Sequence, residues 1–187
     1  METQQPTDLT MQNPSSEATS DQTAKSTLVI TKTLEAPKEL VYQVWTQQEH
    51  LTQWWGPKGM NLEVAELSLE PGGMFLYSMQ AGDGPKMWGK FVYEELSAPE
   101  RMVYVNSFSD EEGNTIRAPF SQTWPLELRN ILTFSEENGQ TILTLQAKPQ
   151  NATPEEVQTF EASLEAIKQG FGGTMDNLAL YLANLRS

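Results

Sequence analysis

The fold of this chain is decided by its last segment, TPEEVQTFEASLEAIKQGFGGTMDNLALYLANLR, which spans residues 153–186. Thr153, followed by Pro154 and Glu156, predicts a helix start with a capping box. Apolar side chains then recur at steps of three and four, at Phe160, Leu164, Ile167, Phe171, Met175, Leu178, Leu182 and Leu185. This spacing predicts one long helix with a single apolar stripe, which needs an apolar surface to cover it.

Three glycines, Gly170, Gly172 and Gly173, interrupt the predicted helix. Each costs about 1 kcal/mol relative to alanine inside a helix. A close approach of the helix backbone to a sheet, or a kink beside a cavity, would explain them. The alternative is a locally weak helix, and both interpretations stay open at this point.

The segments before this helix predict an antiparallel sheet. Alternation of apolar and polar residues marks strands around residues 62–64, 75–79, 88–96, 102–108, 128–134 and 141–147, separated by turns such as Pro71-Gly72-Gly73 and Asn138-Gly139. A first strand begins near Leu28, and two short helices follow it, the first opened by Pro37. We therefore expect an α+β helix-grip fold, in which a curved antiparallel sheet wraps around the long C-terminal helix.

The first 26 residues differ in composition from the rest of the chain. They are rich in Thr, Gln, Ser, Asn and Pro and contain no aromatic residue. Such a segment buries too little apolar surface to offset its chain entropy. We expect a disordered polar tail over residues 1–26 and one domain over residues 27–187.

The composition excludes several classes of function. The net charge is −13, from 12 basic and 25 acidic side chains, so we expect no nucleic-acid binding. The chain has no cysteine and a single histidine, His50, which argues against thiolate nucleophiles, metal sites and bound cofactors. No apolar stretch approaches the ~18 residues of a membrane span, and no secretory signal pattern opens the chain. We expect a cytoplasmic protein without membrane insertion.

Four short motifs resemble a known family. They are Leu34-Glu35-Ala36-Pro37 with Val41, Val44 and Trp45; Trp54-Trp55-Gly56-Pro57-Lys58-Gly59; Leu69-Glu70-Pro71-Gly72-Gly73-Met74-Phe75; and Gly89 followed by Leu96-Ser97-Ala98-Pro99-Glu100-Arg101-Met102. In this order, with the long helix behind them, they resemble the START-like (SRPBCC, Bet v 1-like) superfamily and its Aha1-type domain, the activator of Hsp90 ATPase homologue 1-like group. The resemblance implies a deep cavity between sheet and helix. Family members use this cavity for hydrophobic or amphipathic small molecules, and in some branches for catalysis.

The resemblance assigns one face of the predicted sheet to this cavity. Alternate strand residues and part of the helix stripe then form a candidate ligand-binding set: Trp54, Trp55, Phe75, Tyr77, Met79, Phe91, Tyr93, Met102, Tyr104, Phe171, Met175 and Leu178. The flexible methionines of such a set adapt to the shape of a ligand. The competing interpretation is that the same side chains interdigitate as a filled core.

Two adjacent tryptophans cannot both face one core. We expect one of Trp54 and Trp55 to pack under the sheet and the other to cap the cavity mouth, where its indole N–H could orient a polar ligand end. Both could instead anchor the two short helices. His50 follows Glu49 at a position where we expect it to face solvent, and we assign it no catalytic role.

Charged residues of the strands offer one further possibility. Glu66, Glu94 or Glu127, together with Arg117 and Arg129, could place a carboxylate of raised pKa in the pocket. A solvated strand face explains the same residues without a functional role.

We expect the protein to bind a hydrophobic or amphipathic small molecule, with residues 110–125 forming a loop that gates the cavity. One alternative is a protein-interaction module with a filled core, related to Hsp90 or another chaperone and to the stress response. Another is a cavity enzyme, cyclase-like or hydrolase-like, that uses a carboxylate or a tyrosine. We assign no catalytic residue from the sequence. The sequence also does not distinguish a monomer from a homodimer.

Overall fold

The computed structural model of the protein describes residues 26–186. The predicted disordered tail lies outside these residues, apart from its last member, Ser26. The Ser26 hydroxyl donates a hydrogen bond to Glu161 Oε1. The predicted domain over residues 27–187 is described up to Arg186.

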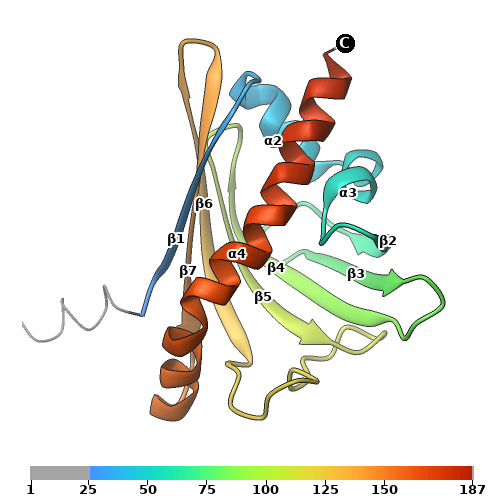
Figure 1. Ribbon diagram of the computed structural model, residues 1–187, viewed down its shortest axis with the longest axis vertical. Coiled ribbons are helices and arrows are strands. Elements are labelled where there is room, and N and C mark those ends of the chain that lie inside the picture. Colours follow the sequence, from blue (N-terminus) through green and yellow to red (C-terminus); the bar gives the residue numbers. More distant parts are fainter. Residues whose placement is uncertain (1–25, 187) are drawn as a thin grey trace, which may run out of the picture.

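The described residues form a seven-stranded antiparallel sheet in the order β1-β7-β6-β5-β4-β3-β2 (Figure 1). The strands are β1 (Leu28–Leu34), β2 (Met60–Leu67), β3 (Met74–Ala81), β4 (Met87–Ser97), β5 (Arg101–Ser109), β6 (Glu127–Glu137) and β7 (Gln140–Gln150). Strands β2 to β7 follow one another as the predicted meander. Strand β1 pairs with β7, with Leu28 opposite Ala147, so the beginning of the domain returns to the edge formed by its last strand.

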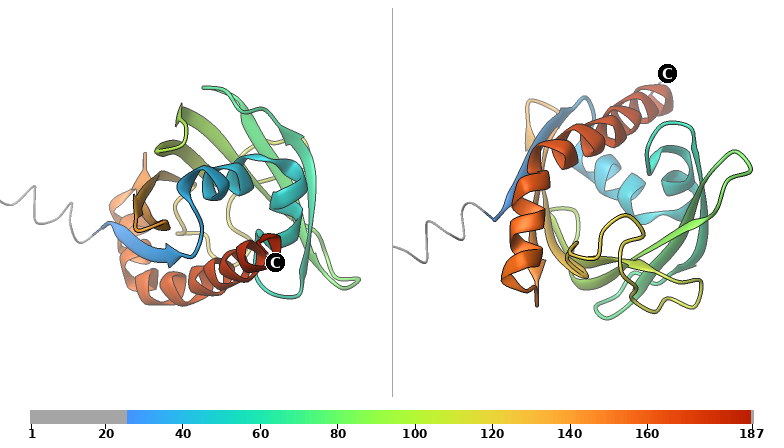
Figure 2. Two further views of the ribbon diagram at one scale, coloured as in Figure 1. Left: turned by 90° about the horizontal axis from the view of Figure 1, so that it is seen from above. Right: turned by 60° about the horizontal axis from the view of Figure 1, so that its bottom comes forward.

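Three helices accompany the sheet in the described part of the chain: α2 (Lys38–Thr46), α3 (Gln48–Trp54) and α4 (Pro154–Leu185). The sheet curves around α4, while α2 and α3 lie at one end of its concave side (Figures 1 and 2). This is the expected α+β helix-grip arrangement.

The start of α4 has the predicted capping box. The Glu156 backbone N–H donates to Thr153 Oγ1 over 3.3 Å, and the Thr153 N–H donates to Glu156 Oε2 over 2.8 Å. The turn between β6 and β7 also follows its sequence, because Asn138 and Gly139 both adopt positive φ, 54° and 77°. Both features depend only on residues that lie within three positions of each other in the sequence.

The glycines of α4 do not mark a close approach to the sheet. A Cβ atom added at Gly170, Gly172 or Gly173 would meet nothing within 4 Å. Figure 2 shows instead that α4 changes direction between its first and second halves. Of the predicted alternatives, the close approach is therefore wrong, whereas a bent or locally weak helix agrees with the structure.

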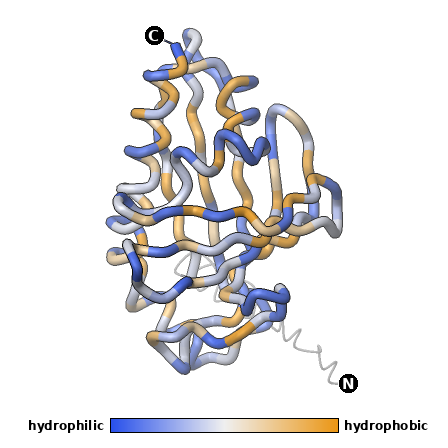
Figure 3. The backbone as a smooth tube through the Cα atoms, turned by 90° about the vertical axis from the view of Figure 1, so that its right-hand side faces the viewer, coloured by the Kyte–Doolittle hydropathy of each residue, from blue (hydrophilic) through white to orange (hydrophobic). Residues whose placement is uncertain are grey.

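The core lies between the concave face of the sheet and the apolar stripe of α4. Phe160, Met175, Leu178 and Leu182 of the stripe are at most 1% exposed. The second half of α4 packs into a large cluster with α2, α3 and the sheet, whereas Phe160 belongs to a smaller cluster with residues of β1, β6 and β7. Hydrophobic and hydrophilic positions alternate along the strands, as period-two patterning requires (Figure 3).

Candidate functional site

The concave face of β3 and β4 is built from directly opposed residues. Tyr77 lies opposite Gly89, and Phe75 lies opposite Phe91. Because opposed residues of an antiparallel pair share a face, these side chains all point to the same side of the sheet. A Cβ atom at Gly89 would lie 2.8 Å from the Tyr77 hydroxyl oxygen, so the glycine makes room for the tyrosine ring.

Most of the predicted ligand-binding side chains pack against one another on this face. The rings of Phe91 and Tyr104 stack with centroids 4.2 Å apart, and those of Phe75 and Tyr77 with centroids 4.7 Å apart. The following members of the set are at most 7% exposed: Trp54, Phe75, Tyr77, Phe91, Tyr93, Met102, Tyr104, Met175 and Leu178. The half-buried members, Trp55, Met79 and Phe171, pack against them. Their role in ligand binding stays a prediction.

The two adjacent tryptophans have different surroundings. Trp54 is buried, and its Nε1 donates to the Val44 carbonyl oxygen over 3.0 Å, which ties α3 to α2. Trp55 meets Phe91 of the sheet and Phe171 of α4 edge to face, at centroid distances of 5.3 and 6.1 Å. Trp55 therefore occupies the space between the sheet and the long helix.

Two hollows adjoin at the end of the sheet where β4 begins and β5 ends. The inner pocket has a volume of about 110 Å³, and its walls include Tyr77, Met79, Gly89 and Asn106. The loop pocket has a volume of about 620 Å³, and the loop contributes Asp110, Glu111, Glu112, Ile116 and Pro119 to its lining. Both pockets are lined by Met87, Trp88 and Phe108.

The strand register explains why a hollow forms at this place. Pairing between β4 and β5 begins with Trp88 opposite Ser109. The β4–β5 ladder does not extend beyond that pair, and Ile116 and Pro119 from the following loop line the hollow beside it. The walls of the loop pocket are thus mainly apolar, with charged residues of the loop turn beside them.

The inner pocket offers uncharged polar groups. Asn106 Oδ1 accepts a hydrogen bond from Asn130 Nδ2 over 2.7 Å. Burial raises the pKa of Tyr77 to about 12. The nearby Trp55 indole N–H lowers this pKa in part, although it does not reach hydrogen-bonding geometry. The Tyr77 hydroxyl is therefore neutral at physiological pH and able to donate a hydrogen bond.

The expected pocket carboxylates lie elsewhere. Glu94 is exposed and pairs with Arg129, with Oε2 and Nε 2.7 Å apart, and Glu66 is exposed as well. Glu127 accepts a hydrogen bond from Asn151 over 3.3 Å. None of the three glutamates lines the inner pocket or the loop pocket, which agrees with a solvated strand face.

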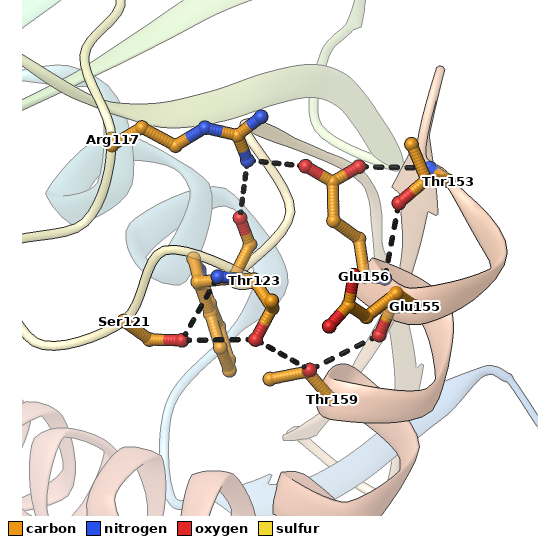
Figure 4. Close-up of polar contacts among 8 residues, drawn as sticks. Arg117, Ser121, Thr123, Thr153, Glu155, Glu156 and Thr159 are labelled. Carbon is orange, nitrogen blue, oxygen red and sulfur yellow. Dashed lines mark hydrogen bonds and ion pairs between the residues drawn. The ribbon is translucent and has the colours of Figure 1, made fainter.

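The loop between β5 and β6 is tied to the first turns of α4 (Figure 4). The Arg117 guanidinium pairs with Glu156 and also donates to the Trp124 carbonyl oxygen over 3.2 Å. The Thr159 hydroxyl donates to Thr123 Oγ1 over 2.9 Å. Arg117 therefore holds the loop in place, and it lines neither the inner pocket nor the loop pocket.

A third hollow lies between α3 and the second half of α4. This helix-end pocket has a volume of about 350 Å³ and is lined by Trp54, Trp55 and Tyr181, among others. Beside it, His50 Nδ1 lies 2.7 Å from the Tyr181 hydroxyl oxygen. His50 is half-buried and joins α3 to α4, so the expectation that it faces solvent is wrong.

Sequence reasoning missed several residues that line the inner and loop pockets. A signal for some of them was present, because the alternation through Met102 and Tyr104 continues to Asn106 and Phe108. Met87 lies opposite Met79 in the register. For Ile116, no comparable signal exists, since it belongs to a loop without periodicity.

The helix-grip fold and its apolar concave face lead to a family assignment. A family model described as "Activator of Hsp90 ATPase homolog 1-like protein" matches residues 35–183. The chain belongs to this family. The resemblance carried by the sequence motifs is thereby confirmed. No curated protein matches the chain.

Solved structures share the fold of this Aha1-like protein. Ms6760 from Mycobacterium smegmatis is 23% identical with a TM-score of 0.70, over 87% of this chain and 94% of that one. A protein from Arthrobacter aurescens is 20% identical with a TM-score of 0.71, over 86% and 88% of the two chains. A protein from Staphylococcus epidermidis is 22% identical with a TM-score of 0.68, over 85% and 90%.

No helix within residues 26–186 combines the length and the apolar character needed to span a membrane. The same residues bring no three histidine, aspartate or glutamate side chains together as a metal site.

Proposed function

We propose that the protein binds a hydrophobic or amphipathic small molecule in the loop pocket, with one end reaching into the inner pocket. The observation that carries this proposal is the mainly apolar hollow of about 620 Å³ beside the concave face. Its volume falls within the range of about 300–1,000 Å³ that is typical of small-molecule sites. Met87, Trp88 and Phe108 connect it to the inner pocket.

The two pockets suit chemically different parts of the ligand. The inner pocket, at about 110 Å³, has room for a small end group only. There the Asn106 amide and the neutral Tyr77 hydroxyl provide hydrogen bonds that fix orientation. The body of the ligand would lie against Met87, Phe108 and Ile116, where burial of apolar surface supplies most of the affinity.

This location differs from the one expected from the sequence, a cavity between the sheet and the C-terminal helix, because no residue of α4 lines either pocket. The middle of the space between sheet and helix is occupied by Trp55, which packs on Phe91 and Phe171. The proposed site therefore lies at the end of the sheet under the loop. Of the predicted set, Tyr77 and Met79 take part in it.

Two measurements test the proposal. Native mass spectrometry of the protein purified mildly from its own host is expected to show an adduct that is lost on denaturation. Nile red, a neutral apolar dye, is expected to gain fluorescence with the protein and to bind several-fold more weakly to Ile116→Trp, which fills the loop pocket. Val29→Trp is the matched control, because Val29 is 48% exposed on β1 and lines none of the three pockets.

The proposal fails if no adduct forms and Nile red does not bind. It also fails if Ile116→Trp binds the dye as tightly as Val29→Trp. In the second case the dye reports another surface of the protein.

A protein-interaction role is the second candidate, and the close packing of the predicted ligand-binding set favours it. If the core is filled, the function depends on the outer surface. The protein has a net charge of −13, so a partner would meet an acidic protein. Retention of Hsp90 in a pull-down, lost at high salt, would support this role. Absence of retention would remove it.

A further inference from the structure

We propose that the loop pocket selects amphiphiles with a protonated amine head group over those with an anionic head group. This inference rests on the proposed function, because it names the ligand class for the same pocket. Three observations carry it: the unpaired acidic residues on the loop turn, a buried serine hydroxyl without a partner, and apolar walls directly beside both.

The charge at the pocket is negative on balance, because three acidic residues line it and Lys90 approaches the same turn. Asp110, Glu111 and Glu112 line it in succession where β5 ends. Glu111 and Glu112 are exposed and form no ion pair within residues 26–186. Lys86 is the cation among the lining residues, and its charge is already paired, since its Nζ lies 2.5 Å from Glu63 Oε2.

Asp110 keeps its charge and its position. Its two carboxylate oxygens accept hydrogen bonds from Asn114, at 2.7 Å from the backbone nitrogen and 2.9 Å from Nδ2. The hydrogen bond from the Asn114 side chain is the main cause that lowers the pKa of Asp110. Lys90 Nζ donates to the Gly113 carbonyl oxygen over 2.7 Å, which fixes the next part of the turn.

Ser109 contributes a buried polar group to the lining of the loop pocket. The residue lines the loop pocket and is 2% exposed, yet its Oγ has no hydrogen-bond partner within residues 26–186. A serine oxygen accepts hydrogen bonds, and a primary ammonium group carries three N–H donors. A protonated amine placed here would satisfy the Ser109 oxygen and lie beside the carboxylates, whereas an anionic head would meet their repulsion.

The apolar walls require that the cation carry a hydrocarbon body. Met87, Phe108 and Ile116 surround the same hollow and offer no hydrogen bond from their side chains. A small polar amine would leave this surface exposed to water, and an anionic lipid would place its charge against the acidic turn. The combination therefore fits an amine with an apolar body.

Three decyl probes with the same tail and different heads test the inference: decylammonium, decanol and decanoate. Their binding is measured at pH 7 by displacement of Nile red. The wild-type protein is expected to bind decylammonium roughly tenfold more tightly than decanoate, because the exposed carboxylates of Glu111 and Glu112 each contribute modestly. The ratio is expected to fall as salt is added.

Paired variants place the effect at this pocket. Glu111→Gln with Glu112→Gln is expected to lower the ratio of the two affinities severalfold, with the remainder left to Asp110, and to leave decanol binding unchanged. Glu137→Gln with Glu165→Gln removes the same formal charge from exposed positions that line neither pocket, and it is expected to keep the wild-type ratio. Ser109→Ala is expected to weaken decylammonium severalfold and decyltrimethylammonium, which has no N–H donor, hardly at all.

The outcomes separate the two proposals. If decanol binds but decylammonium and decanoate bind equally, the charge selection is wrong and the apolar site stands. If both double variants lose the preference equally, the overall charge of the protein causes it and the inference is overturned. If none of the three probes displaces Nile red from the protein, the proposed function fails together with the inference.

Discussion

The carboxylate of Glu156 pairs with the guanidinium of Arg117, and this contact joins the first turn of α4 to a loop 39 residues earlier in the chain. Glu156 is also the capping-box residue of α4, since its Oε2 accepts from the Thr153 N–H over 2.8 Å. One buried carboxylate therefore serves both the helix start and the loop that borders the proposed ligand site (Figure 4).

The stability of this junction depends on pH. The hydrogen bond from Arg117 is the main cause that lowers the pKa of Glu156 below its ordinary value of 4.5. Since the pKa is lower in the folded state, the stabilisation is fully present above pH 4.5. It is lost as the pH falls through the folded-state pKa.

We expect Arg117→Ala to lower the free energy of unfolding by about 1 kcal/mol at pH 7 and to flatten its decline below pH 4.5. Urea unfolding at pH 7 and at several pH values below 4.5 measures both effects. Arg129→Ala is the control, because its partner Glu94 is exposed and caps no helix. An unchanged acid slope in Arg117→Ala would contradict this account.

Gly89 is expected to tolerate no side chain. In Gly89→Ala the new methyl group would lie 2.8 Å from the Tyr77 hydroxyl oxygen and 2.9 Å from the ring carbon that bears it. Tyr77 has little room to move, because its ring stacks on Phe75. Overpacking of this kind costs about 1–3 kcal/mol, and thermal unfolding should show a lower Tm. A Tm equal to that of the wild type would mean that the tyrosine ring shifts freely into the inner pocket.

Gly172 is expected to behave in the opposite way. Its added methyl group would meet nothing within 4 Å, and the residue lies inside α4. Gly172→Ala should raise the free energy of unfolding by about 0.5–1 kcal/mol through helix propensity alone. The same urea experiment measures it, with Gly89→Ala as the contrasting variant. A loss of stability would indicate that the change of direction in α4 requires this glycine.

His50 is expected to contribute to stability and not to ligand binding. Its Nδ1 lies 2.7 Å from the Tyr181 hydroxyl oxygen, and it lines neither the inner pocket nor the loop pocket. His50→Ala should lower the free energy of unfolding by about 1 kcal/mol, the usual contribution of one hydrogen bond. Nile red affinity should stay unchanged. Weaker dye binding would move the proposed site toward the helix-end pocket.

The local features of the fold could be predicted because each depends on neighbouring residues. Thr153 caps α4 through a residue three positions away, and Asn138-Gly139 makes its turn within one hairpin. The strands of the meander follow from period-two alternation, and the long helix follows from its apolar stripe. The motifs around Pro37, Trp54 and Gly72 were sufficient for the family.

The long-range contacts could not be predicted in the same way. His50 and Tyr181 are 131 positions apart, and Leu28 pairs with Ala147 across the whole domain. No periodicity links such residues, because their proximity depends on how the entire sheet curves around α4. The same holds for Arg117, because its ion pair with Glu156 depends on where the loop lies against α4.

The sequence by itself determined the α+β helix-grip fold, the family, and the face of the sheet on which Tyr77 and Met79 lie. Only the tertiary structure decided which part of that face is hollow. Periodicity reports the side to which a side chain points, whereas a cavity depends on the summed volumes of side chains from distant segments. Trp55 fills the middle of the space, and the hollow lies where the β4–β5 ladder ends at Trp88 and Ser109.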